Sequence, residues 1–326
     1  MGRKFFSSGP SSDPTYEFYL NEPQAAPVRD KIEAMWAQYE PYCPDSNFLT
    51  EARRHFVERT WEMRLGCVLL ERGFPLVCAG SAGPDICIDV SPRIWVEATA
   101  VSSGVGADRV PDRAKRAFTV AERGYTDEEL PGIDWHGRPP SEESVILRCT
   151  QALEEKRRNY DRYMRAGIVK PTERCVVAMS LAGIDQSFFL CDFDGIPIFL
   201  KALFGIGPER LLLSRSDAEK DRLYRPPRPE VTKANGAKVA AHAFASSTHR
   251  QISGAFGTCM DIINAPLSAG DEIMFVNNPR AQAPIGAGTF DFGMEFVAAE
   301  SVTGANGTID RRDHRRRYER REPCLR

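Results

Sequence analysis

Apolar residues recur at helical spacing in three stretches of the chain. The stretch 47–73 repeats them every three or four positions and ends at Gly73, a residue that commonly follows the last turn of a helix. The stretch 144–166 carries a similar apolar stripe, and Ser141 provides a helix N-cap. A shorter helix is predicted at 26–39. The pattern therefore predicts two long helices separated by some seventy residues of other structure.

Runs rich in β-branched and apolar residues predict strands around these helices. Strands are expected at 74–79, 85–90 and 94–101, and the turn Ser91-Pro92-Arg93 would make a hairpin of the last two. The run 174–181 is continuously apolar, as in a strand that is buried on both faces. The order is helix, three strands, helix, strand. A strand–helix–strand crossover favours an α/β protein with a mixed sheet.

Two carboxylates are predicted to meet on the hairpin. Asp85 ends a Pro-Asp turn at the start of one strand, and Glu97 lies twelve residues later, in the middle of the next. Because strand side chains alternate between faces, Glu97 and Thr99 share a face. Hard oxygen ligands on a rigid sheet, with positions left for phosphate and water, are what a magnesium-dependent phosphodiesterase requires.

This motif, in this order of elements, resembles the PD-(D/E)XK nuclease superfamily, which includes restriction endonucleases, Holliday-junction resolvases and repair exonucleases. The resemblance implies a restriction-endonuclease-like mixed sheet core and cleavage of DNA with Mg²⁺ or Mn²⁺. Asp85 and Glu97 would hold the metal. Glu62, on the core side of the first long helix, would contribute a third ligand directly or through water, and is preferred to Glu58 one turn earlier.

One position departs from the superfamily pattern, because Thr99 stands where members usually carry a lysine two residues after the second acid. The next helix offers a substitute. Lys156 precedes Tyr160 by four residues, a spacing similar to the Gln-x-x-x-Tyr element of several repair nucleases in the superfamily. We expect Lys156 to orient or activate the attacking water, and Tyr160 to position the phosphate or brace Lys156.

An alternative interpretation follows from the same departure. Lys156 lies within the charged run EEKRR, as a solvated lysine would. The protein would then be a catalytically degenerate nuclease-fold protein that binds nucleic acid or a protein partner. A homodimer is a further option that the sequence leaves open.

The rest of the chain predicts additional parts around this core. We expect an N-terminal arm at 1–45, a nuclease-like core at 46–204 with an inserted loop at 102–140, a β-rich extension at 205–300 and an arginine-rich tail at 301–326. The extension either continues the sheet or forms a second lobe. Basic residues of the inserted loop could approach a phosphate backbone, with a solvated loop as the alternative: Arg109, Arg113, Lys115 and Arg116.

Composition narrows the class of protein. The 326 residues are 42% apolar, enough for a substantial core, and the formal charge of −2 argues against a generally basic DNA-coating protein. Nine cysteines without a CxxC pair predict thiols in a reducing compartment, buried in the apolar stretches around Cys78, Cys87, Cys175 and Cys191. No run of eighteen apolar residues predicts a membrane span, and the expected location is cytoplasmic.

Overall fold

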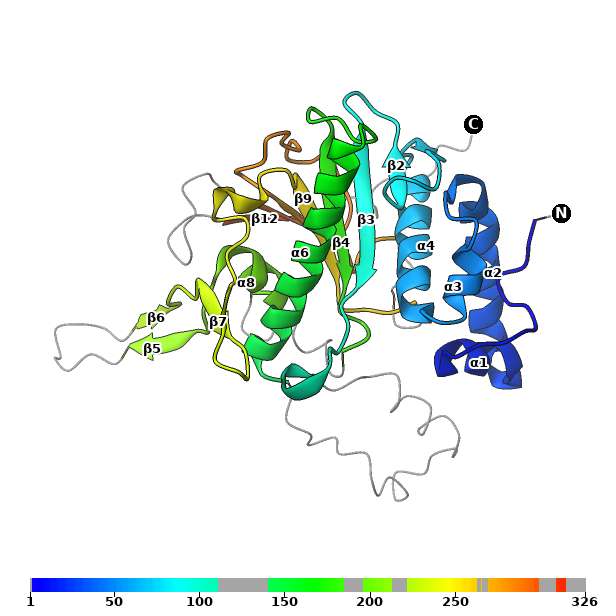
Figure 1. Ribbon diagram of the computed structural model, residues 1–326, viewed down its shortest axis with the longest axis horizontal. Coiled ribbons are helices and arrows are strands. Elements are labelled where there is room, and N and C mark those ends of the chain that lie inside the picture. The colour runs from blue at the N-terminus through cyan, green and yellow to red at the C-terminus, as the bar shows by residue number, and fades with distance from the viewer. Residues whose placement is uncertain are drawn as a thin grey trace, which may run out of the picture.

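An eight-stranded mixed sheet forms the centre of the protein in the computed structural model, which describes residues 2–110, 140–184, 196–212, 222–262, 265, 269–298 and 309–314. The strand order is β1-β2-β3-β4-β9-β10-β11-β12. Two short hairpins, β5–β6 and β7–β8, stand apart from this sheet (Figure 1). The strands are β1 Leu76–Val77, β2 Ile86–Ile88, β3 Ile94–Ala100, β4 Arg174–Ser180, β5 Arg210–Leu212, β6 Arg222–Tyr224, β7 Glu230–Thr232, β8 Lys238–Ala240, β9 Gly254–Thr258, β10 Met274–Asn277, β11 Met294–Ala298 and β12 Ile309–Asp313.

Both parallel and antiparallel pairs occur in the large sheet. Strands β1, β2 and β3 are joined by antiparallel pairing, whereas β3, β4 and β9 are parallel neighbours. The pairing then alternates, with β10 antiparallel to β9, parallel to β11, and β11 antiparallel to β12. The predicted mixed α/β class is confirmed. The direct pairing of β4 with β9 also shows that the C-terminal strands continue the sheet.

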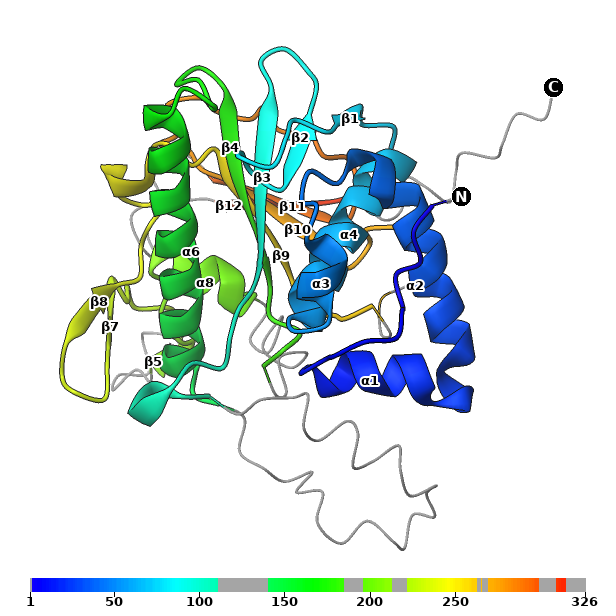
Figure 2. The ribbon, with the colours of Figure 1, turned by 45° about the vertical axis from the view of Figure 1, so that its right-hand side comes forward.

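Helices cover both faces of this sheet. Figure 2 shows β3 running between α6 on one side and α4 on the other, with α1 and α2 beyond α4. The α-helices are α1 Pro14–Asn21, α2 Ala26–Tyr39, α3 Phe48–Ala52, α4 Phe56–Glu71, α6 Glu142–Arg165 and α8 Ile198–Phe204. Short 3₁₀ turns are η1 Pro23–Ala25, η2 Glu40–Tyr42, η3 Gly106–Asp108 and η4 Ser247–His249.

Alternation along β3 separates two apolar clusters. Trp95 packs with the residues of α6, whereas Val96 and Ala98 pack with those of α2 and α4. Glu97 lies between Val96 and Ala98 in sequence, so its side chain points to the α6 face, like Trp95. This places the polar residues of β3 opposite the charged stripe of α6.

Several predicted elements have the expected positions. The helix expected at 26–39 is α2, with those bounds, and the helix expected at 144–166 is α6, which starts two residues earlier behind the Ser141 cap. The run 94–101 is β3 and the run 174–181 is β4. The runs 74–79 and 85–90 form strands of only two and three residues.

The single helix predicted at 47–73 is wrong. Two helices, α3 and α4, replace it, and residues 53–55 between them are not helical. The break is held by the N-terminal segment, since Ser12 N and Asp13 N donate to Arg53 O, and Phe56 N donates to Asp13 Oδ2 at 2.9 Å. Helical spacing continues through the break, so local sequence gave no sign of contacts made by residues forty positions away.

The predicted N-terminal arm packs tightly against α4. Its core is aromatic: Phe5, Tyr16, Trp36 and Tyr39 are all fully buried. Glu33 holds the first residues of the chain against α2, because its carboxylate accepts hydrogen bonds from Phe5 N at 2.8 Å and from Phe6 N at 2.9 Å. The hydrogen bonds of Ser12 N, Asp13 N and Asp13 Oδ2 to residues 53 and 56 join the arm to the rest of the molecule.

The cysteines do not all follow the prediction. Cys87 and Cys175 are buried free thiols, as expected, but Cys78 is exposed because it follows the very short β1. Cys259 is disulfide-bonded. Cys191, the loop residues Arg113, Lys115 and Arg116, and residues 315–326 of the arginine-rich tail lie outside the described residues. No helix in the described ranges is long and apolar enough to cross a membrane.

Candidate functional site

The hairpin of β2 and β3 brings Asp85 and Glu97 together. Ile86 pairs with Val96, so the residue before Ile86 lies opposite the residue after Val96, and both side chains are on the α6 face. Asp85 is fixed by a hydrogen bond from Ala98 N to its Oδ2 at 2.8 Å. The predicted meeting of these two residues on one hairpin is therefore present in the structure.

Helix α6 supplies donors to Glu97. Lys156 Nζ lies 3.1 Å from Glu97 Oε2, and Asn159 Nδ2 donates to the same oxygen at 3.2 Å. Glu97 is only 2% exposed. Burial alone would lower the pKa of Lys156, but the carboxylates of Glu97 and Asp85 outweigh it and raise that pKa above its ordinary value. Lys156 is therefore a largely buried ammonium at neutral pH, suited to stabilising negative charge.

Glu62 is held from the opposite side by α4 and the N-terminal arm. Tyr39 Oη donates to Glu62 Oε1 at 3.1 Å, and Arg59 Nη1 lies 2.8 Å from Oε2. Arg59 also pairs with Asp45 at 3.2 Å. Burial raises the pKa of Glu62 to about 7, although Arg59 acts in the opposite direction. Both carboxylate oxygens already have partners, so Glu62 is placed to act through water or through its charge.

Asp85 lies between the residues around Glu97 and the residues around Glu62. Its backbone carbonyl accepts from Tyr39 Oη at 3.4 Å, and its side chain faces Glu97. Burial, then the charges of Glu62 and Glu97, raise the pKa of Asp85 well above its ordinary value. Within the described ranges, Asp85 Oδ1 accepts no hydrogen bond. A cation bound beside Asp85 would offset the repulsion between its carboxylate and those of Glu62 and Glu97.

The donor set suits a hydrated hard cation better than a closed metal cage. Three carboxylates, Glu62, Asp85 and Glu97, face two cationic side chains, Arg59 and Lys156. Among residues with described positions, no three His, Cys, Asp or Glu side chains converge closely enough to form a metal-binding group. Mg²⁺ is often held by one or two carboxylates, with water and phosphate completing its shell. Asp85 and Glu97 fit that mode.

The remaining predicted site residues take supporting positions. Tyr160 is fully buried, with its hydroxyl 2.9 Å from Trp95 O and 2.7 Å from Val176 O, so it fixes α6 onto β3 and β4. Thr99 lies on the same face as Glu97 and is 9% exposed. The ammonium that reaches Glu97 comes from α6, and the β3 position two residues after Glu97 holds a hydroxyl.

Three residues around the site carried no prediction from the sequence: Tyr39, Asn159 and Tyr163. Asn159 lies three positions after Lys156, so helical spacing could have identified it. Burial and the nearby Glu97 raise the pKa of Tyr163, one turn beyond, to about 12. Tyr39 contacts Glu62 through tertiary packing and had no signal in the motif, whereas Arg59 lies three positions before Glu62 on α4, a spacing at which helix side chains form ion pairs. Glu58 also lies near the site, since its charge contributes to the raised pKa of Lys156.

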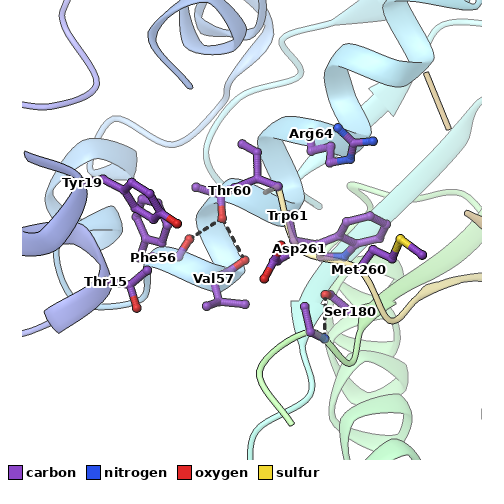
Figure 3. Close-up of a pocket in the computed structure, with 12 residues that line it drawn as sticks. Thr15, Tyr19, Phe56, Val57, Thr60, Trp61, Arg64, Ser180, Met260 and Asp261 are labelled. Atoms are coloured by element: carbon purple, nitrogen blue, oxygen red, sulfur yellow. Dashed lines mark hydrogen bonds between the residues drawn. The ribbon is translucent and has the colours of Figure 1, made fainter. Parts of the chain in front are cut away.

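A separate pocket lies on the other side of α4 (Figure 3). Its lining combines the start of α4 with α1 and the ends of β4 and β9, and includes Phe56, Trp61 and Ser180. Its polar groups are largely engaged within the protein: Thr60 Oγ1 donates to Phe56 O, and Arg64 pairs with Glu272. None of the carboxylates near Lys156 lines it.

Comparisons with family models, with curated proteins and with solved structures found no match.

Proposed function

We propose that the protein is a metal-dependent phosphodiesterase that cleaves DNA, built on a restriction-endonuclease-like core. The observation that carries the proposal is the pairing of Asp85 with Glu97 across β2 and β3, with the Lys156 ammonium 3.1 Å from Glu97. The succession of α4, three strands, α6 and β4 supports it, because it places both acids on the face that α6 covers.

Each residue has a role that its contacts allow. Asp85 and Glu97 would hold Mg²⁺ or Mn²⁺, and the bound metal would lower the pKa of a water molecule and neutralise phosphate charge. The protonated Lys156 orients the water and stabilises charge that develops on the phosphate. Asn159 fixes Glu97 Oε2, and Glu62 adds negative charge beside Asp85.

DNA as the substrate rests on the resemblance of the motif and on the charge around α6. Arg162 and Arg165 are exposed in the last turns of α6, beyond Lys156. Exposed guanidinium groups near a phosphodiesterase centre suit contacts with a phosphate backbone. A near-neutral chain is compatible with local rather than general nucleic-acid binding.

A catalytically degenerate binding protein is the second candidate. It is favoured by Thr99 at the usual lysine position and by the Lys156–Glu97 ion pair, which could serve stability alone. In this case the same face would bind nucleic acid or a protein partner without cleaving it.

The test is cleavage of supercoiled, linear and single-stranded DNA with Mg²⁺ or Mn²⁺. Asp85→Asn and Lys156→Ala should each lower cleavage by at least about a hundredfold, as loss of a metal ligand or a charge-stabilising group does. Matched controls are Asp89→Asn, in the exposed Asp89–Arg93 ion pair, and Lys238→Ala, in the exposed Lys238–Glu230 pair. Both controls should retain cleavage.

The outcomes separate the two candidates. Metal-dependent cleavage that is lost only in the site variants supports the phosphodiesterase. Binding of DNA without cleavage, in protein whose thermal unfolding shows a folded state, would favour the degenerate binding protein. Cleavage that persists in Asp85→Asn would refute the assigned site.

A further inference from the structure

We propose that the N-terminal arm is part of the active site, and that Tyr39 is a positioning residue that holds Glu62 and Asp85 in the arrangement needed to bind the metal. The proposal rests on the proposed function and extends it to helix α2, which lies outside the core that the nuclease motif implies. Figure 2 shows α2 alongside α4, the helix that carries Glu62.

One hydroxyl group contacts both acidic residues. Tyr39 Oη is 3.1 Å from Glu62 Oε1 and 3.4 Å from the backbone carbonyl of Asp85. Its proton can serve only one acceptor at a time, and the shorter contact identifies Glu62 as the main one. Tyr39 therefore lies between the start of β2 and α4, and sets the distance between them.

The backbone of α4 is shaped to receive this ring. A Cβ atom on Gly66, one turn after Glu62, would lie 2.4 Å from the Tyr39 ring, closer than any side chain could come. The ring is fully buried and also packs near Phe48, with their centroids 6.0 Å apart. The position of the hydroxyl is therefore fixed by packing on several sides, as a positioning residue requires.

A second contact from the same region holds the other oxygen of Glu62. Asp45 Oδ2 lies 3.2 Å from Arg59 Nη2, and Arg59 Nη1 lies 2.8 Å from Glu62 Oε2. The Arg59 guanidinium also lies over the Phe48 ring, 5.4 Å from its centroid. Residues 39–48 thus hold one oxygen of this buried carboxylate directly, through Tyr39, and support the other through Arg59. Partners of this kind commonly change metal affinity by about 10–100-fold when they are removed.

The test is the affinity for Mn²⁺, measured by titration calorimetry on the full chain without DNA. Tyr39→Phe should weaken Mn²⁺ binding by about tenfold, because Glu62 and Asp85 lose a shared anchor. The matched control is Tyr16→Phe, which removes an equally buried hydroxyl of the arm. This hydroxyl accepts a hydrogen bond from Ser7 N at 3.0 Å and does not contact the site residues. This control should keep the wild-type affinity.

A second variant covers the case in which Tyr39→Phe does not fold. Asp45→Asn weakens the hold on Arg59 at a partly exposed position and should also weaken Mn²⁺ binding, whereas Asp30→Asn, on the exposed face of α2, should not.

Two results overturn the proposal and can be told apart. If the wild-type protein binds Mn²⁺ and Asp85→Asn abolishes binding, but Tyr39→Phe and Asp45→Asn bind as tightly as wild type, only the role of the arm is refuted. If the wild-type protein does not bind Mn²⁺, the proposed function fails together with it.

Discussion

Replacing Glu62 with Gln is expected to stabilise the protein at neutral pH, even though Glu62 forms an ion pair with Arg59 at 2.8 Å. The carboxylate is 2% exposed, and burial raises its pKa from 4.5 to about 7 despite Arg59 and the Tyr39 hydroxyl. The contacts around it thus do not fully offset the cost of burying its charge. Gln keeps the shape of the side chain and removes that charge.

The magnitude follows from the two pKa values. In the unfolded chain Glu62 loses its proton near 4.5, and in the folded protein near 7, so between these values the folded state binds more protons. A group whose pKa is raised in this way destabilises the folded state increasingly as pH rises through that window, and fully above it. At about 1.4 kcal/mol for each tenfold change in the proton equilibrium, the cost reaches about 3 kcal/mol.

The assay is urea unfolding of wild type and Glu62→Gln in EDTA, from about pH 4 to about pH 9. The difference in the free energy of unfolding should be near zero at the acidic end, where Glu62 is protonated in both states, and should rise to about 3 kcal/mol in favour of Gln above neutrality. The loss of repulsion on Asp85 acts in the same direction. Glu71→Gln, at the exposed end of α4, is the control and should show no such curve.

A difference that does not change with pH would refute the reasoning, because it would mean that Glu62 titrates alike in the folded and unfolded states. A Gln variant that is less stable than wild type above neutrality would also refute it, since the Arg59 ion pair would then exceed the cost of burial.

Three further predictions follow from the packing and the chemistry of the site. Gly66→Ala should destabilise the fold by about 1–3 kcal/mol, measured by urea unfolding, because the new methyl group overlaps the Tyr39 ring; a neutral effect would contradict this contact. Tyr160→Phe should cost about 1–3 kcal/mol in the same assay, by removing the buried hydrogen bond that the hydroxyl donates to the backbone of β3 or β4, while Mn²⁺ affinity measured by calorimetry stays near that of wild type. Thr99→Lys introduced into Lys156→Ala should restore part of the DNA cleavage lost in the single variant, measured on supercoiled DNA; no recovery would count against an exchangeable lysine position.

Local pattern was sufficient for much of the core. The β2–β3 hairpin followed from two short β-rich runs around Ser91-Pro92-Arg93, and it alone places Asp85 opposite Glu97. The strongly amphipathic stretch that forms α6 and the continuous apolar run of β4 gave those elements nearly to the residue. In each case one pattern of apolar residues continued along the whole element.

Long-range contacts decided what the pattern could not. The break between α3 and α4 depends on Asp13 and Arg53, which meet only after folding. Strands β11 and β12 were not predicted, because their short runs gain stability from pairing with a sheet that is already formed.

The candidate site divides in the same way. The sequence by itself determined that Asp85 and Glu97 lie on one hairpin and that Lys156 lies on the helix after it, since strand register and helical spacing are local properties. Only the tertiary structure decided that Lys156 reaches Glu97, that the Tyr160 hydroxyl holds α6 to the sheet, and that Tyr39 contacts Glu62. Those contacts join elements whose relative positions are set by packing of the whole core, and no local pattern encodes them.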